Sequence, residues 1–100
     1  HTCGVTSSGS VECWGWDHVG QSTPPFGTFV SVGAGVKHNC GVTTNGSVEC
    51  WGSDTSGQSN PPSGNFQSVN GFGYYTCGVT SSGLVECWGT DEYGQVSDAP

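Results

Sequence analysis

Six cysteines in three pairs are the residues of this chain whose spacing points most clearly to chemistry. The members of each pair stand ten residues apart, and corresponding cysteines recur every 37 residues. There is no CxxC spacing, and no histidine lies at a zinc-finger offset, so disulfides are favoured over a zinc site or free buried thiols. Disulfide bonding predicts an oxidising compartment.

Carboxylates recur in the same register, at Asp17, Asp54 and Asp91. Each is a weak candidate calcium ligand, because its loop also offers carbonyl oxygens. An Asx turn, in which the carboxylate closes the loop on its own backbone, is the favoured interpretation. Repetition in every unit indicates structure, whereas an active site needs one convergent set of groups. We therefore expect no enzyme activity, no cofactor and no resident metal.

Several aromatic residues do not recur: Trp16, Tyr74, Tyr75 and Tyr93. Exposed rings beside Asp, Asn and Gln are typical of sugar-binding surfaces, so these four are candidate ligand-binding residues. The recurring tryptophans, Trp14, Trp51 and Trp88, are expected to pack between repeated units instead.

One N-glycosylation sequon is present, at Asn45-Gly46-Ser47. Asn45 is a candidate acceptor at an expected hairpin tip. A turn-forming role explains the same residue and is the favoured interpretation.

The composition excludes several partners. The chain has 100 residues and a net charge of −7, and Lys37 is its only basic residue. Nucleic acids and anionic membranes are bound mainly through Lys and Arg, so we expect neither as a partner. No apolar run approaches about 18 residues, so we expect no membrane insertion.

Eighteen glycines and few helix-favouring residues indicate strands and tight turns. "CGVT" and "SVECW" flank "SSG" or "TNG", which predicts a hairpin with a left-handed glycine in its turn. This register sets Cys3 opposite Cys13, and cysteines so opposed can form a disulfide. The other expected pairs are Cys40 with Cys50 and Cys77 with Cys87.

The pattern of a Gly-rich bend, His-Thr, a hairpin, Trp-Gly and Gly-Gln, as in "HTCGVTSSGSVECWGWDHVGQSTPP", resembles the repeat of the regulator-of-chromosome-condensation family. The resemblance implies an all-β propeller of four-stranded blades, usually seven around an axis. The paired cysteines are similar to those of the extracellular members, which implies an extracellular, secreted protein. The chain would be a single repeat module over 1–100, with repeats at 1–37 and 38–74 and a partial one at 75–100.

Three hairpins accompany only two F-x-S-V segments, Phe29–Val32 and Phe66–Val69. The chain is thus too short to close a ring by itself, and it is either part of a longer propeller or a unit that continues from chain to chain. The leading prediction is an acidic structural subunit that self-assembles into a ring or filament by end-strand complementation. The alternative is a secreted, lectin-like module that binds carbohydrate or protein.

Overall fold

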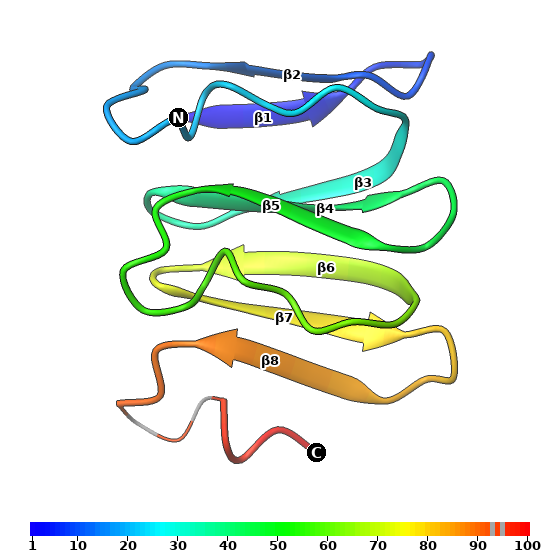
Figure 1. The fold of residues 1–100 in the computed structure, drawn as a ribbon, viewed down its shortest axis with the longest axis vertical. Helices are drawn as coiled ribbons and strands as arrows, with labels where there is room; N and C mark the ends of the chain where they lie inside the picture. Colours follow the sequence, from blue (N-terminus) through cyan, green and yellow to red (C-terminus); the bar gives the residue numbers. More distant parts are fainter. Residues whose placement is uncertain (93, 95) are drawn as a thin grey trace.

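Eight β-strands and their connections make up the computed structural model, which describes residues 1–92, 94 and 96–100. They form three antiparallel sheets with the strand orders β1-β2, β3-β4-β5 and β6-β7-β8. Figure 1 shows the sheets stacked along the long axis, with the N-terminus at the first and the C-terminus beyond the last. The expected all-β fold is confirmed. The strands are β1 (Thr2–Val5), β2 (Val11–Trp14), β3 (Phe29–Ala34), β4 (His38–Thr43), β5 (Val48–Gly52), β6 (Phe66–Phe72), β7 (Tyr75–Thr80) and β8 (Val85–Gly89).

The three hairpins have the predicted register. In the first, Val5 lies opposite Val11 and Cys3 opposite Cys13. The turn closes through the Gly9 amide, which donates to the Thr6 carbonyl at 2.9 Å, and Gly9 has a φ of 90°. That conformation suits glycine because it has no Cβ. The β4–β5 and β7–β8 hairpins repeat the same pairing.

The implied four-stranded blades are wrong for the described residues, where each sheet has two or three strands. The segment after each hairpin runs as turns and loops. Pro24-Pro25 and Pro61-Pro62 lie in these segments, and proline has no amide hydrogen to donate to a neighbouring strand. The prolines therefore disfavour a regular strand at these positions, where the structure has turns and loops.

Each three-stranded sheet combines parts of two sequence repeats. β3 ends the first repeat but pairs with β4 of the second, and β6 pairs in the same way with β7. β3 also contacts the preceding β1–β2 sheet, because the Phe29 amide donates to the Gly9 carbonyl of the hairpin turn at 2.8 Å. The Phe66 amide donates to the Gly46 carbonyl at the same distance. Neighbouring sheets are thus linked both covalently and by backbone hydrogen bonds.

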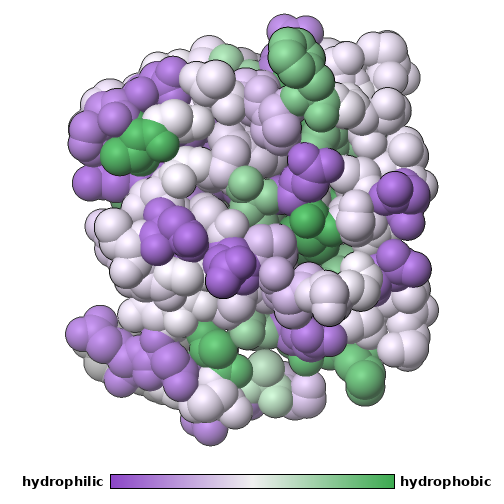
Figure 2. Space-filling model, viewed as in Figure 1, coloured by the Kyte–Doolittle hydropathy of each residue, from purple (hydrophilic) through white to green (hydrophobic). Residues whose placement is uncertain are grey.

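The hydrophobic core lies between the sheets in two separate clusters. On the broad face drawn in Figure 2, hydrophobic residues form small patches separated by polar and neutral ones. No helix in the described part of the chain is long and apolar enough to cross a bilayer.

Two glycine-rich strand ends bring β3 and β6 into close backbone contact. A Cβ at Gly33 would lie 2.8 Å from the Cα of Asn70, and one at Gly71 would lie 2.7 Å from the amide nitrogen of Gly35. Both contacts are with backbone, so neither can be relieved by a side-chain rotation. Glycine is required here to let neighbouring sheets approach.

We expect Gly33→Ala to lower the free energy of unfolding by about 1–3 kcal/mol, because the added methyl group forces the two strands apart. Chemical denaturation followed by tryptophan fluorescence measures this change. Gly73→Ala is the matched control, since a Cβ at Gly73 has no atom within 4 Å and should change stability much less. Equal effects of the two substitutions would contradict the close approach of β3 and β6.

Candidate functional site

A tryptophan and a disulfide meet in each space between two sheets. Trp51 belongs to the cluster of Val11 and Phe29, against which Cys3 and Cys13 of the first sheet pack. Trp88 belongs in the same way to the cluster of Cys40, with Cys50 packed against it. Trp51 and Trp88 are 9% and 8% exposed, and each meets a phenylalanine edge to face, with ring centroids 6.1 and 5.9 Å apart. We call this repeated contact the blade interface.

All six cysteines are bonded in the structure, and each bond crosses one hairpin between directly opposed residues. Because side chains alternate along a strand, the neighbouring tryptophan lies on the other face of the same hairpin. Each hairpin thus has a cystine face and an indole face. The pairs are Cys3–Cys13, Cys40–Cys50 and Cys77–Cys87.

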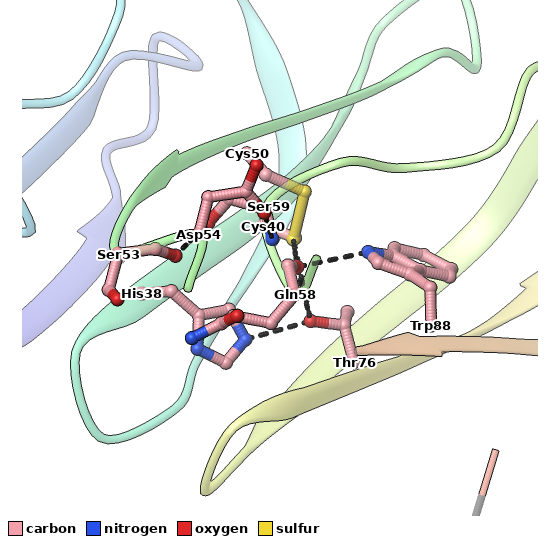
Figure 3. Close-up of a disulfide and its surroundings, with 9 residues drawn as sticks. All are labelled: His38, Cys40, Cys50, Ser53, Asp54, Gln58, Ser59, Thr76 and Trp88. Atoms are coloured by element: carbon pink, nitrogen blue, oxygen red, sulfur yellow. Dashed lines mark hydrogen bonds between the residues drawn. A yellow bond between two sulfur atoms is a disulfide. The ribbon is translucent and has the colours of Figure 1, made fainter. Parts of the chain in front are cut away.

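Buried polar groups complete the second blade interface, which Figure 3 shows around the Cys40–Cys50 disulfide. The backbone carbonyl of Gln58 accepts hydrogen bonds from Trp88 Nε1 at 3.0 Å and from Thr76 Oγ1 at 3.1 Å. The Gln58 side chain folds back, and its Oε1 accepts the Ser56 amide at 2.8 Å. The recurring Gly-Gln pair therefore holds a loop so that one carbonyl faces the next sheet.

His38 is fully buried in this interface, and its Nε2 lies 2.8 Å from Thr76 Oγ1. Because that hydroxyl donates its proton to the Gln58 carbonyl, it must accept from Nε2–H, which fixes the neutral tautomer. Nδ1 has no hydrogen-bond partner among the described residues. Burial lowers the pKa of His38 below 6.5, while the Tyr75 backbone and the Asp54 carboxylate act in the opposite direction.

The lowered pKa of His38 makes stability depend on pH. Unfolded chains take up a proton on this residue near pH 6.5, whereas the folded chain does so only at lower pH. We expect stability to be full above pH 6.5 and to fall below it, by at most about 1.4 kcal/mol per pH unit from this group. Denaturant midpoints between pH 8 and pH 4.5 measure the slope.

His38→Gln should flatten this slope, whereas His18→Gln at an exposed position should leave it unchanged. A slope that survives in the His38 variant would assign the pH dependence to other groups.

The two blade interfaces differ at one position. In the first, Asn39 takes the place of Thr76, and its Nδ2 donates to the Gln21 carbonyl at 2.6 Å. His1 Nε2 lies 3.2 Å from Asn39 Oδ1, which matches the contact of His38 with Thr76. Trp51 Nε1 is buried without a partner among the described residues. The side-chain amide of Asn39 thus takes the place at the Gln21 carbonyl that Trp88 Nε1 has at the Gln58 carbonyl, which leaves Trp51 Nε1 unpaired.

We expect Asn39→Thr to release the Gln21 carbonyl for Trp51 Nε1 and to raise stability by up to about 1 kcal/mol. The reciprocal change, Thr76→Asn, should leave Trp88 Nε1 unpaired and lower stability by about 1–3 kcal/mol. Unfolding curves give both values, and the indole NH shifts in NMR spectra report the hydrogen bonds directly. Two changes of the same sign would contradict this explanation.

The three recurring aspartates accept hydrogen bonds within their own loops. Asp17 accepts from the Ser22 amide at 2.8 Å and from the Thr23 hydroxyl at 2.7 Å. These bonds lower the pKa of Asp17, and bonds from Ser97 and Val96 lower that of Asp91. Asp54 accepts the Ser59 amide at 2.8 Å. No three His, Cys, Asp or Glu side chains gather as a possible metal site within the described ranges.

Asn45 lies at the exposed tip of the β4–β5 hairpin. Its Oδ1 accepts from the Ser47 amide at 3.3 Å and from the Ser47 hydroxyl at 2.9 Å, and it also accepts from the Thr43 hydroxyl. The Asn45 side chain thus caps its own turn through Oδ1. None of these bonds uses Nδ2, the atom that glycosylation modifies.

The structure separates the candidate aromatic residues. Tyr74 lines a cleft among the loops, and Trp16 stacks on His18, which lines the same cleft, with ring centroids 4.7 Å apart. Tyr75 lies elsewhere, stacked on Phe72 at 5.2 Å. Tyr93 lies outside the described residues.

We call this hollow of about 370 Å³ the loop cleft. Loops from all three sheets contribute to it: the loops after β2 and β5, the β3–β4 turn and the β6–β7 turn. Sequence reasoning missed His18 and Lys37, which do not recur, although Lys37 stands out as the only basic residue. The polar lining residues are His18, Lys37, Ser53, Thr55, Ser56 and Tyr74.

The two ends of the stack expose the two halves of a blade interface. Trp14, which was expected to be packed, is 58% exposed because no other part of the described chain covers its face. At the other end, Cys77 and Cys87 line a hollow of about 400 Å³ beside Tyr75, Phe72 and residues of the C-terminal segment. The indole face is thus exposed, and the cystine face is half-buried, with C-terminal residues lining the hollow beside it.

Comparisons with known proteins agree with the fold. Residues 29–58 match the repeat described as "Regulator of chromosome condensation (RCC1) repeat". The entire ectodomain of the Physcomitrella patens receptor kinase CR4 is similar at a TM-score of 0.82 and 24% identity, over 98% of this chain and 30% of that one. The CRINKLY WD40 ectodomain of the Arabidopsis thaliana receptor kinase ACR4 is similar at 0.76 and 30% identity, over 98% and 34%.

This chain therefore spans about a third of the length of the ectodomains that it matches. No curated protein matches it significantly. The resemblance to the disulfide-containing, propeller-type repeat is confirmed, and the likeness to the first ectodomain concerns the fold alone.

Proposed function

We propose that this chain, a segment of RCC1-type propeller repeats with its own disulfides, is an extracellular binding and building module that associates through its two end faces. The occupant of each end face is a blade of the same kind from a second copy of the chain. The observation that carries the proposal is the blade interface, which occurs twice inside the molecule and is left open once at each end.

Trp14 supports the proposal at the first end. It occupies the position of Trp51 and Trp88, which pack on a preceding cystine face. An indole that is more than half exposed leaves a large apolar area in water, and its burial is favourable. Trp14 can dock on a cystine face in the same way as its two counterparts.

The opposite end offers such a face. Val79 and Val85 lie beside Cys77 around a hollow of about 120 Å³, whereas the corresponding Val42 and Cys40 of the second sheet are completely covered. Contact between the two ends joins unlike surfaces, so it can close a ring or extend a filament.

End-strand complementation was expected to join copies of the chain. A second copy can cover an end face, but its described residues offer no free strand. β1 has one partner strand, while β4 and β7 each have two. β3 and β6 are already paired within the chain, and the described residues leave no unpaired strand to complete β1. A copy therefore contributes an end face, and the edge of β1 remains available to a further strand.

The cysteines and the comparisons support an extracellular location. Six cysteines in local disulfides persist in oxidising compartments. The two similar structures are receptor ectodomains. The recurring aspartates of this chain, Asp17, Asp54 and Asp91, accept hydrogen bonds within their own loops, which supports binding over catalysis as its role.

Light scattering after size-exclusion chromatography tests the association at several protein concentrations. We expect a mass that rises with concentration, and Trp14→Ser should weaken the association by at least about tenfold, because a central tryptophan typically contributes about 2 kcal/mol or more.

Phe26→Ser is the matched control, since Phe26 is fully exposed in a loop outside both end faces. A monomer at every concentration, or equal effects of the two substitutions, would overturn the proposal.

Recognition of a carbohydrate or protein ligand is the second candidate function. The loop cleft favours it, because residues from all three sheets converge there and Tyr74, one of the expected ligand-binding aromatics, lines it. A screen of neutral and acidic glycans with the chain and with Tyr74→Ala tests this candidate.

A further inference from the structure

We infer that the loop cleft binds an acidic saccharide and that Lys37 contacts its carboxylate. The inference rests on the second candidate function and names the ligand class. A volume of about 370 Å³ is within the range of small-molecule sites, roughly 300–1,000 Å³.

The charge distribution supports an anionic ligand. The chain has eight acidic residues and a single Lys or Arg, and that one cation lines the cleft. No carboxylate belongs to the lining within the described part of the chain. The acidic neighbours of the lining residues along the chain, Asp17 and Asp54, accept hydrogen bonds from the Ser22 and Ser59 amides of their own loops. A carboxylate group in the cleft would therefore meet the single Lys or Arg of the chain, and no acidic side chain among the described lining residues.

Lys37 lies over an aromatic ring. Its Nζ is 5.4 Å from the ring centroid of Trp16, a cation–π distance, and Trp16 stacks on His18 with an interplanar angle of 17°. The side chain of Lys37 is half-buried, so fewer rotamers must be lost on binding. The contact with Trp16 favours one position of the ammonium group, where it can meet one anionic group of a ligand.

The remaining lining is suited to a sugar. Ser53, Thr55, Ser56 and Tyr74 supply hydroxyl groups, which both donate and accept hydrogen bonds as sugar hydroxyls do. The exposed ring of Tyr74 provides an apolar face for a pyranose. Lys37 supplies one positive charge, which balances a singly charged carboxylate, whereas a phosphate group carries about −1.5 to −2 charges at pH 7 and would leave part of its charge uncompensated by the described lining. The geometry thus favours a uronic-acid type of residue over a phosphorylated ligand.

Calorimetric titration with an oligogalacturonate, a neutral galacto-oligosaccharide of equal length and inorganic phosphate tests the inference. We expect the oligogalacturonate to bind, and Lys37→Gln to weaken its binding by about tenfold or more, as for loss of a charged hydrogen bond. Lys37→Arg should retain most of the affinity because it keeps the charge. Ser7→Asp, at a hairpin turn outside the cleft lining, changes the net charge equally and should have little effect.

Absence of oligogalacturonate binding, or binding that Lys37→Gln leaves unchanged in a variant with the wild-type unfolding midpoint, would overturn the inference. Phosphate binding of equal strength would replace it with a simple anion site. Equal binding of the neutral sugar, lost in Tyr74→Ala, would keep the recognition function and overturn only the acidic ligand. Trp14→Ser lies outside the cleft and should bind the oligogalacturonate normally, so failure of self-association is distinguishable from failure here.

Discussion

Packing of a tryptophan, a phenylalanine and a cystine in one cluster between neighbouring sheets is the contact on which the stack depends. The chain has few large apolar residues, and each sheet is too thin to bury them by itself. Trp51 and Trp88 solve this problem by covering the cystine of the preceding hairpin together with Phe29 or Phe66. Because each hairpin has unlike faces, the stack has a direction, and every added sheet recreates an indole face and a cystine face.

Polar groups fix how closely two sheets dock. The carbonyls of Gln21 and Gln58 each receive donors from the next sheet, and the glutamine side chains brace the loops that carry these carbonyls. Burial strengthens these hydrogen bonds, because little water competes for their donors and acceptors. The same burial opposes protonation of His38, whose second ring nitrogen has no described partner to stabilise an added proton.

Local pattern predicted local structure well. Hairpin register and cysteine pairing follow from the turn glycines and an invariant spacing, since both are decided within about a dozen residues. The four-stranded blade came from the family resemblance, although the prolines of the loop segments already disfavour a regular strand there. The surroundings decide the exposure of Trp14, which has the same adjacent residues along the chain as Trp51 but is far more exposed. The repeat pattern also gave no sign of the role of Lys37, because this residue occurs only once. Its place in the loop cleft depends on loops from three sheets that come together only in the folded chain.

The disulfide across each hairpin has a mechanical consequence. When the chain is pulled from its ends, tension bypasses each ribbon through the sulfur bridge that joins residues ten positions apart, so the ribbon cannot unravel. Force falls instead on the loops and on β3 and β6, each of which bridges two sheets. Under load, the layers would separate and β3 and β6 would detach from their sheets, while each disulfide-bridged hairpin stayed intact. Reduction of the bridges would convert this stiff tether into a longer, more extensible one.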